Sequence, residues 1–438
     1  MTNPKATKRP VRATDEHRVV ITGYGACTCI GHNARDTWES MREGRNGIAI
    51  YDPTQFDVYP GVWKTRIGGE IKDFSVEGVL EPREAKKLDR STVLGVAAAV
   101  ECARHSGVDF DALDGSRGGV VIGSGIGGIQ TIEDSLNVLS AKGPGRISPF
   151  TVPRLMANAT AGNVSIRFGL QGPCSAHATA CASSGHAIGD AMSYIRRGIA
   201  DVMLAGGAEA ALTPLCIGAF STMKALSTRN EEPDKASRPF DQGRDGFVLA
   251  EGAACFVLES LEHAQKRGAT IYAELVGYGN SGDAHHITAP DAEGSGAARS
   301  MEGALEDARL NPADIDYVNA HGTSTPLGDH AEVSAVLRVF GDHVRASAGG
   351  KLVMSSTKSM HGHALGASGA VETLACMHSV REGVIPPTIN LDDPDEGFDL
   401  DLVAHASREK PVRYAMNNTF GFGGHNVTLI VGRYDGSS

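Results

Sequence analysis

The sequence predicts an α/β fold made of two similar halves that pack against each other as one compact unit. Four fragments recur in the same order along the chain, each half alternates strand-like with helix-like segments, and the connection between the halves is not rich in proline. This order implies right-handed strand–helix–strand units and mostly parallel sheets covered by helices. We place the halves at residues 18–265 and 266–438, after a flexible N-terminal tail at residues 1–17.

The first two recurring fragments are a strand and a helix end. Residues 19–25 and 273–279 are apolar runs closed by Gly-Tyr-Gly, as expected of a buried strand that leaves its sheet. Residues 101–104 and 306–309 share a Glu-x-Ala-Arg pattern near the end of a segment with helical periodicity. Each half therefore begins with a strand followed by a helix.

The other two fragments are a second strand and a second helix. Residues 119–123 and 316–321 are short apolar strands. Gly-His-Ala-Ile-Gly at 185–189 and Gly-His-Ala-Leu-Gly at 362–366 each open a helical segment. Each half is therefore predicted to run strand, helix, strand, helix.

Composition and charge exclude several classes of protein. The chain has 438 residues, 41% of them hydrophobic, and contains no apolar run of the ~20 residues that span a bilayer. The N-terminus lacks the apolar core of a secretory signal. A net charge of −11 argues against nucleic acid as a general partner. We expect a soluble cytoplasmic protein that does not cross a membrane.

Eight cysteines in a chain of this length do not form a dense disulfide framework, so reduced thiols fit better. Cys27 and Cys29 have no second Cys or His pair at zinc-ligand spacing, and we interpret both as structural. No metal is expected.

Cys181 is the candidate nucleophile. The small residues around it suit a sharp turn between a strand and a helix. The N-terminus of that helix would offer free N–H groups and a positive dipole end, which predict a lowered thiol pKa and part of an oxyanion hole. Taken alone, such a cysteine is more often a buried structural residue, so its role depends on partners elsewhere.

His321 ends an apolar strand and is followed by Gly, Thr, Ser and Pro, a composition typical of a loop. Loops at the carboxyl ends of parallel strands are where open α/β sheets bind ligands. A single histidine there is more often only hydrogen-bonded, but the hydroxyls of Thr323, Ser324 and Thr325 suit a polar substrate arm.

Lys358 and His363 lie five residues apart before a glycine-rich helix. His361 and His363 resemble a metal-binding pair, but no carboxylate or cysteine follows at matching spacing. Glu372, nine residues past His363 on what we take to be the same helix, is a candidate to orient that histidine.

The repeat relates two of these turns. It superposes Gly185 on Gly362, so we expect the turns of Cys181 and His363 at equivalent positions of the two halves. Two turns related by a pseudo-dyad can converge on one site.

Two further segments are rich in glycine. Residues 417–426 predict a loop of close backbone approach with a movable aromatic side chain, and they lack the Lys and Ser or Thr of a phosphate-binding loop. Residues 123–128 are a weak dinucleotide-binding signal, because no acidic residue is convincingly placed.

Together these motifs resemble the β-ketoacyl-acyl carrier protein synthases, specifically the elongating type II enzymes of bacterial fatty acid synthesis. The resemblance extends from residue 17 to 434 and is carried by TACASSGHAIG at 179–189, MKALSTRN at 223–230, SRPFDQGRDGFVLAEGA at 237–253, YAELVGYGNSGDAHHIT at 272–288, VNAHGTSTPLGD at 318–329, STKSMHGHALGASGAVE at 356–372 and NNTFGFGGHN at 417–426.

The resemblance implies a thiolase-like fold with two pseudo-dyad-related α/β halves in αβαβα layers, and a homodimer. It also implies a catalytic set of Cys181, His321 and His363. Initiating synthases have Asn where His363 stands, and chain-length-factor homologues lack the cysteine. The chain has all three residues, so the resemblance implies an active enzyme.

The implied reaction is the decarboxylative condensation of an acyl-carrier protein with a malonyl-carrier protein. No cofactor is held permanently, because the carrier protein delivers its phosphopantetheine arm. Cys181 holds the acyl chain, and the two histidines stabilise the enolate through Nε2. Lys358 organises His363 together with Glu372, and the backbone N–H groups of Cys181 and Phe422 form the oxyanion hole.

The resemblance also implies roles for residues around the pocket. Pocket-lining residues are Ile126, Phe220 and Phe422; pantetheine ligands are Thr323 and Thr325; gate residues are Asp283, Thr288, Phe422 and Gly423; carrier-docking residues are Arg83, Lys86, Lys87, Arg146 and Lys224. For the basic residues, a merely solvated surface is a nearly equal alternative.

Three departures from the family pattern weaken any inference about chain length. His361 and His425 stand where the family often has Thr, and residues 343–352 are slightly longer than usual. One alternative is a ketosynthase of a polyketide or aryl-polyene pathway with the same chemistry. Another is a noncatalytic partner that shapes a second subunit's cavity, against which the intact Cys-His-His set argues.

Overall fold

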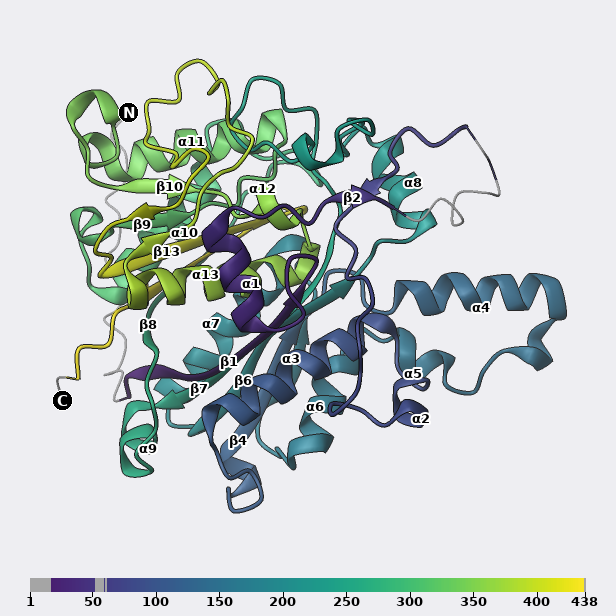
Figure 1. Cartoon of the computed structure of the whole chain (residues 1–438). Helices are drawn as coiled ribbons and strands as arrows, with labels where there is room; N and C mark the ends of the chain where they lie inside the picture. The colour runs from purple at the N-terminus through teal and green to yellow at the C-terminus, as the bar shows by residue number, and fades with distance from the viewer. Residues whose placement is uncertain (1–16, 52–58, 60, 437–438) are drawn as a thin grey trace, which may run out of the picture.

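The computed structural model describes residues 17–51, 59 and 61–436 (Figure 1). The tail predicted at residues 1–17 lies outside the described residues, apart from His17.

Within the described residues, ten strands form one mixed sheet in the order β10-β9-β13-β14-β8-β1-β7-β6-β4-β5. Their bounds are β1 Val19–Thr28, β4 Gly118–Gly123, β5 Cys174–His177, β6 Val202–Ala210, β7 Glu251–Ser260, β8 Ala273–Gly282, β9 Tyr317–Asn319, β10 Val353–Ser355, β13 Tyr414–Gly421 and β14 His425–Gly432. Two-stranded ribbons join β2 (Ala49–Ile50) to β3 (Ile67–Gly68) and β11 (Val384–Ile385) to β12 (Arg408–Glu409).

The strand order shows the duplication directly. Outward from the centre, one half runs β1, β7, β6, β4, β5, and the other runs β8, β14, β13, β9, β10. Each half thus places its own five strands in the order first, fifth, fourth, second, third. Strands β1 and β8 join the halves through three antiparallel residue pairs, from Val19↔Leu275 to Ile21↔Ala273. The two similar α/β halves are therefore confirmed, whereas their division at residues 265 and 266, at the end of α9 (Leu261–Lys266), stays a prediction.

The expectation of mostly parallel sheets is only partly correct. In each half the outer three strands are parallel, but the inner two run antiparallel to their neighbours. In the second half the cause is local: only residues 422–424 separate β13 from β14, with Gly423 and Gly424 at positive φ. So short a connection forms a hairpin and cannot hold a crossover helix.

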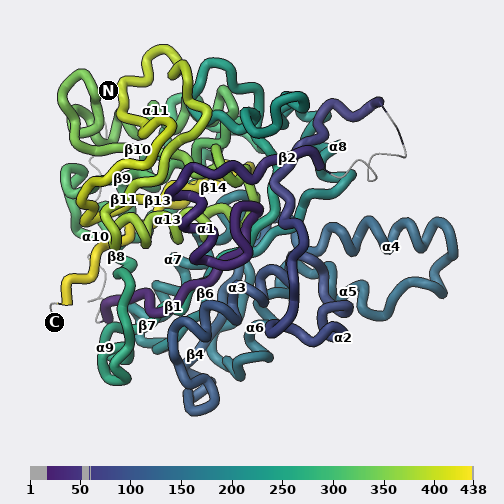
Figure 2. Tube along the Cα trace, in the orientation of Figure 1, coloured from purple at the N-terminus to yellow at the C-terminus, as the bar shows by residue number. Residues whose placement is uncertain are grey.

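The helices form three layers around the strands (Figures 1 and 2). Between the two halves of the sheet lie α7 (Ser183–Arg196) and α13 (Ser368–Glu382), which contact each other and strands of both halves. The outer layers hold α3 (Arg90–Ser106) and α6 (Ala159–Phe168) on one side, and α10 (Ser295–Ala308) and α11 (Pro326–Phe340) on the other. This is the αβαβα layering of a thiolase-like fold.

Small residues allow the central layer to pack closely. A Cβ at Gly189 of α7 would lie 2.3 Å from the ring of Tyr278, and one at Gly185 would lie 2.8 Å from Val427. Residues 368–380 of α13 are all buried, as expected of a helix covered on every side. The central helices therefore have fixed positions against both halves of the sheet.

The remaining helices are peripheral or lie in connections. They are α1 Ala34–Glu43, α2 Pro82–Ala85, α4 Ile129–Lys142, α5 Thr151–Leu155, α8 Pro214–Thr222 and α12 Lys358–His361. Helix α4 projects from the body of the molecule (Figure 1). Among the described residues, no helix has the length and apolar character needed to cross a bilayer.

Candidate active site

Cys181 lies in a short 3₁₀ turn, Ala180–Ala182, between β5 and α7. Ala180 has φ +50°, in the left-handed region that is uncommon for residues other than glycine and turns the chain sharply. The predicted sharp turn between a strand and a helix is therefore present.

A second turn of the same kind precedes α13 in the other half. It is the 3₁₀ turn Leu365–Ala367, whose first residue has φ +41°. Because each turn leads directly into its helix, Cys181 corresponds to Gly366. The predicted superposition of Gly185 on Gly362 is therefore wrong in register, although it paired the correct helices.

His363 reaches the site from the loop between α12 and this second turn. It precedes α13, so the expectation that His363 and Glu372 share a helix is wrong. Its backbone is fixed by N–H donation to Val248 O at 2.7 Å and by its carbonyl, which accepts the N–H of Ala250 at 3.0 Å.

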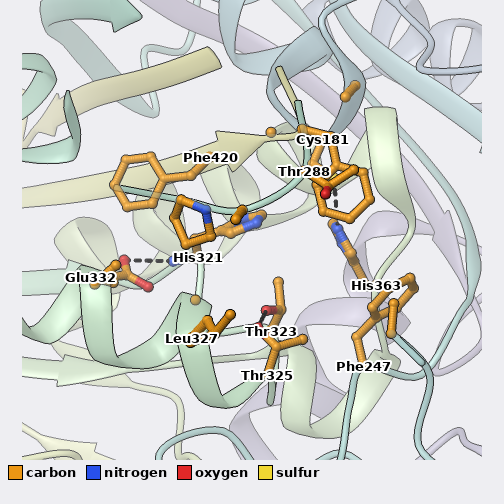
Figure 3. A pocket seen from close by; sticks show the side chains of 18 of the residues that line it. Cys181, Phe247, Thr288, His321, Thr323, Thr325, Leu327, Glu332, His363 and Phe420 are labelled. Carbon is orange, nitrogen blue, oxygen red and sulfur yellow. Dashed lines mark hydrogen bonds between the residues drawn. The ribbon is translucent and has the colours of Figure 1, made fainter. Parts of the chain in front are cut away.

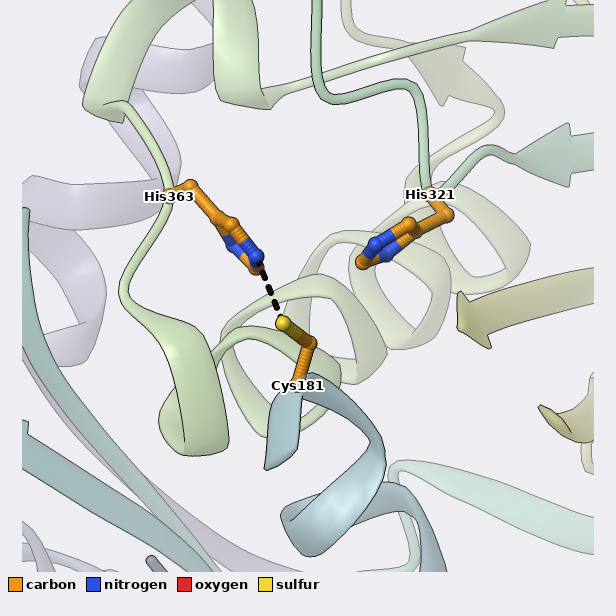
Figure 4. A group of neighbouring side chains, drawn as sticks. All are labelled: Cys181, His321 and His363. Atoms are coloured by element: carbon orange, nitrogen blue, oxygen red, sulfur yellow. Dashed lines mark hydrogen bonds between the residues drawn. The ribbon is translucent and has the colours of Figure 1, made fainter. Parts of the chain in front are cut away.

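The structure brings the three predicted catalytic side chains together (Figure 4). His363 Nε2 lies 3.0 Å from Cys181 Sγ, and the rings of His321 and His363 are 5.3 Å apart at 84°. All three side chains are buried, with 8%, 9% and 3% exposure for Cys181, His321 and His363. One half supplies the sulfur and the other half supplies both imidazoles.

The thiol of Cys181 does not have the lowered pKa that the sequence predicts. Burial raises its pKa to about 12, and the positive charge of Lys358 offsets only part of this shift. The backbone N–H groups of Phe422 and Cys181 also donate toward the sulfur, and the oxyanion hole assigned to them stays a prediction. Burial outweighs the helix terminus because it penalises the thiolate directly.

Both histidines are neutral at physiological pH. Burial, and then the charge of Lys358, hold the pKa of His321 and of His363 well below 6.5. His363 Nδ1 lies 2.9 Å from Ser368 Oγ. Since a hydroxyl can donate or accept, Ser368 is compatible with either tautomer of this imidazole.

Lys358 is placed beside a different histidine from the one predicted. Its Nζ is 3.4 Å from His321 Nδ1, and it forms a short ion pair with Glu372. Burial raises the pKa of Glu372 to about 7, against the effect of that ammonium. Because an ammonium only donates, it favours the His321 tautomer that carries its proton on Nε2.

Two carboxylates that the sequence reasoning missed hold the loop of His321. Glu332 of α11 accepts the backbone N–H groups of His321 and Gly322 at 2.8 and 2.7 Å. Asp329, one helical turn earlier, accepts the next two N–H groups of the loop. The i,i+3 spacing of these acids on a helix that begins at Pro326 was the available signal.

The three side chains line a cavity of about 500 Å³ (Figure 3). Predicted residues that line it are Ile126, Phe220, Asp283, Thr288, Thr323, Thr325, Lys224 and Phe422. Phe247, Leu327 and Phe420 also line it, although the sequence reasoning gave them no role. The hydroxyl oxygens of Thr323 and Thr325 lie 3.0 Å apart on its wall.

The glycine-rich segment predicted as a loop forms the end of β13, a tight turn and the start of β14. Phe422 is 36% exposed, and its ring lies 6.5 Å from that of Phe220. Asp283 braces the turn, donating its N–H to Gly424 O at 2.9 Å and accepting from Asn426 at 2.6 Å. Gly423 donates its N–H to Ile287 O at 2.7 Å, which ties the turn to the segment of Thr288.

The predicted docking residues are all exposed. Arg83 lies in α2, Lys86 and Lys87 follow it, and the ammonium of Lys87 lies 5.5 Å from the centre of the Phe150 ring. Arg146 precedes Phe150 in the connection between α4 and α5. Lys224 follows α8 and lies on the cavity wall.

The sulfur of Cys181 and one ring nitrogen from each histidine lie within 4.8 Å of one another, a spacing that can hold a metal ion. The ammonium of Lys358 beside His321 opposes a second positive charge there. The expectation that no metal binds stays a prediction.

The duplicated fold, with a cysteine from one half facing histidines from the other, defines the class of thiolase-like condensing enzymes. Two family models make the assignment specific: "Beta-ketoacyl synthase, N-terminal domain" matches residues 16–264, and "Beta-ketoacyl synthase, C-terminal domain" matches residues 272–392. The chain belongs to the β-ketoacyl synthase family, and it is an acyltransferase of the condensing type.

Relatives match over nearly the whole chain. The 3-oxoacyl-(acyl-carrier-protein) synthase 2 of Vibrio harveyi is 48% identical, covering 95% of this chain and 98% of the relative. The enzyme of the same name from Coxiella burnetii is 47% identical, covering 96% and 99%.

Solved structures agree on the fold. A beta-ketoacyl synthase from Burkholderia phymatum has a TM-score of 0.87 at 37% identity, covering 95% of this chain and all of that one. A type II polyketide ketosynthase, solved with its acyl-carrier protein and bound to the hexaketide, has a TM-score of 0.86 at 33% identity, with the same coverage.

Proposed function

We propose that this chain catalyses the elongation step of fatty acid synthesis, the decarboxylative condensation of an acyl-carrier protein with a malonyl-carrier protein. The observation that carries the proposal is the 3.0 Å contact between Cys181 Sγ and His363 Nε2, in a cavity that His321 also lines. The higher identity to the fatty acid enzymes than to the polyketide ketosynthase favours fatty acid elongation over the polyketide alternative. The presence of Cys181 argues against a noncatalytic partner.

In the first step Cys181 takes the acyl group from the carrier thiol. Because the thiol is protonated at rest, its proton passes to Nε2 of neutral His363 as the sulfur attacks the thioester carbon. The N–H groups of Cys181 and Phe422 stabilise the oxyanion. The bond to the carrier sulfur then breaks, and His363 returns the proton to the departing thiolate.

In the second step the malonyl thioester loses carbon dioxide. The carbon–carbon bond to the carboxylate breaks, and its electron pair forms an enolate whose oxygen accepts hydrogen bonds from Nε2 of His321 and of His363. Lys358 keeps the His321 proton on Nε2, whereas Ser368 allows His363 to change tautomer between the two steps. His321 is therefore a fixed donor, and His363 is both base and donor.

In the third step the enolate carbon attacks the Cys181 thioester. The same backbone N–H groups stabilise the second oxyanion, and collapse breaks the carbon–sulfur bond. The product is a β-ketoacyl-carrier, and the Cys181 thiolate takes a proton from solvent to restore the resting thiol. One proton is consumed and one carbon dioxide is released in each cycle.

The cavity walls support a channel for the carrier's phosphopantetheine arm, so no permanent cofactor is needed. Thr323 and Thr325 offer adjacent hydroxyls for its amides. We assign Phe422 and Gly423 to a gate braced by the segments of Asp283 and Thr288; Phe422 lies on the wall of the same cavity that Ile126 and Phe220 line.

Two interaction surfaces complete the proposal. Strand β5, at the end of the sheet, exposes Cys174 and Ser175. Helix α4 and residues 150–156, which contain α5, expose apolar side chains: Leu136, Leu139, Phe150, Val152 and Met156. We assign these surfaces to a second copy of the chain, which would form a homodimer. An acidic acyl carrier protein docks on the exposed basic side chains of Arg83, Lys86, Lys87, Arg146 and Lys224. The enzyme acts in the cytoplasm.

The proposal is tested by product formation. The protein is incubated with an acyl-carrier protein and a malonyl-carrier protein, and the carrier products are identified by mass. A β-ketoacyl-carrier two carbons longer than the substrate is expected. Only malonyl decarboxylation, with no lengthened chain, would contradict the proposal.

A further inference from the structure

Glu209 near the end of β6 is a buried carboxylate that the mechanism above does not use. Its side chain is fully buried, and no ion pair involves it among the residues that the structure describes. A buried carboxylate without a cation is costly unless hydrogen-bond donors surround it.

Four donors from two separate segments satisfy this carboxylate. Oε2 accepts the backbone N–H groups of Gly125 and Gly366 at 2.6 and 3.1 Å. Oε1 accepts the hydroxyl of Ser124 at 3.0 Å and the N–H of Ile126 at 3.3 Å. A neutral glutamine has a single acceptor oxygen and cannot replace this arrangement.

Both segments form walls of the cavity beside the nucleophile. Ile126 and Leu365 line the cavity with Cys181, and Leu365 precedes the residue bound by Glu209. The segments approach so closely that a Cβ at Gly366 would lie 2.3 Å from the nitrogen of Gly125. A Cβ at Gly125 would in turn lie 3.3 Å from the carbonyl oxygen of Ala180. Glu209 thus lies where the two cavity walls meet the Ala180–Ala182 turn that carries Cys181.

We propose that Glu209 is a positioning residue that holds Ile126 and Leu365 against the acyl chain and so sets which chain lengths Cys181 accepts. The inference rests on the proposed function, because it requires an acyl chain in this cavity. It also gives a role to Gly125 within the glycine-rich residues 123–128, because a Cβ there would lie 2.9 Å from Oε2 of Glu209.

The test compares Glu209→Gln with a matched control. Glu101 also accepts backbone N–H groups from two places, Ala26 at 2.9 Å and Ala34 at 3.0 Å, and it lies in α3, away from the cavity. Glu101→Gln therefore removes the same kind of hydrogen bond without touching the pocket walls. The readout is the rate at which Cys181 is acylated by hexanoyl- and tetradecanoyl-carrier protein, followed by intact mass.

Burial raises the pKa of Glu209 to about 7, so the assay is run at about pH 8.5, where the side chain is ionised. There we expect Glu209→Gln to raise the ratio of tetradecanoyl to hexanoyl acylation about tenfold, the effect of one lost hydrogen bond to a charged group, because the loosened walls admit longer chains. Glu101→Gln should keep the wild-type ratio. Equal slowing of both rates in Glu209→Gln would overturn the inference, since a merely structural role changes rates without changing selectivity.

A second variant guards against misfolding. If Glu209→Gln does not fold, Ser124→Ala removes a single donor and should move the ratio in the same direction by a smaller factor; an unchanged ratio would overturn the inference. Wild-type protein that neither chain acylates would reject the proposed function itself, a result distinct from acylation with unaltered selectivity.

Discussion

The ammonium nitrogen of Lys358 lies 3.4 Å from Nδ1 of His321, and the same nitrogen forms an ion pair with Glu372. This arrangement separates the two histidines chemically. His321 is held as a donor, whereas His363 faces the sulfur and a hydroxyl that supports both tautomers.

Replacement of Lys358 by Ala should therefore affect the second step more than the first. We expect malonyl decarboxylation to fall by about 10²–10³, the effect of losing one preorganised donor, because His321 no longer keeps its proton on Nε2. Acylation of Cys181 should fall less. Both rates are measured on the same preparation, with thermal unfolding to confirm that the variant is folded. Equal loss in both steps would argue that Lys358 acts only on the fold.

The raised pKa of the Cys181 thiol has a direct consequence for its reactivity. Since thiolate is the reacting form and the pKa is about 12, alkylation by iodoacetamide should rise about tenfold for each pH unit and reach no plateau up to pH 10. Peptide mapping separates Cys181 from the exposed Cys174. A plateau of the alkylation rate below pH 8 would show that the pKa of the Cys181 thiol is lowered, as expected from its position at a helix N-terminus.

The turn that carries the proposed gate should not tolerate a side chain at Gly424. Its φ is +72°, and a Cβ there would lie 2.8 Å from that of Asp283, whereas Gly397 has φ +84° with open space around it. Both Ala variants carry a backbone strain of about 1–2 kcal/mol, but only Gly424→Ala displaces Asp283. We expect kcat/KM to fall at least about tenfold for Gly424→Ala relative to Gly397→Ala, as a clash of ~1.4 kcal/mol implies. Equal kcat/KM values for the two variants would show that Asp283 does not support the turn in a way that matters for catalysis.

The proposed docking of an acyl carrier protein on the exposed basic residues predicts an effect on KM that depends on salt. Reversal of charge at Lys86 and Lys87 should raise the KM for carrier-bound substrates several-fold at low ionic strength and leave kcat nearly unchanged, because exposed charges steer association. Lys266→Glu, at the exposed end of α9, is the matched control. An unaltered KM would leave these lysines as a solvated surface.

Much of the fold could be predicted because the repeated strands and helices have recognisable local sequence patterns. The apolar runs closed by Gly-Tyr-Gly are the paired central strands β1 and β8, and the equivalent helices were correctly matched. The register failed because the true equivalence, Cys181 with Gly366, depends on positive φ at Ala180 and Leu365, where the residue types differ. The similar Gly-His-Ala sequence at residues 362–364 lies eight residues before the true equivalent of residues 185–187, and it misled the sequence alignment.

The site was predictable where chemistry resides in a motif and not where it arises from packing. Cys181, His321 and His363 each lie in a distinctive segment, and all three meet. Glu209 is a single acid in a strand, and its donors Gly125 and Gly366 come from distant parts of the chain. The thiol pKa also required the structure, because burial is a tertiary property.

The most direct test of the central claim is the intact mass of the protein after incubation with an acyl-carrier protein. The account predicts a mass gain equal to one acyl group in the wild type and none in Cys181→Ala. No gain in the wild type, or an equal gain in Cys181→Ala, would contradict the assignment of Cys181 as the residue that holds the growing chain.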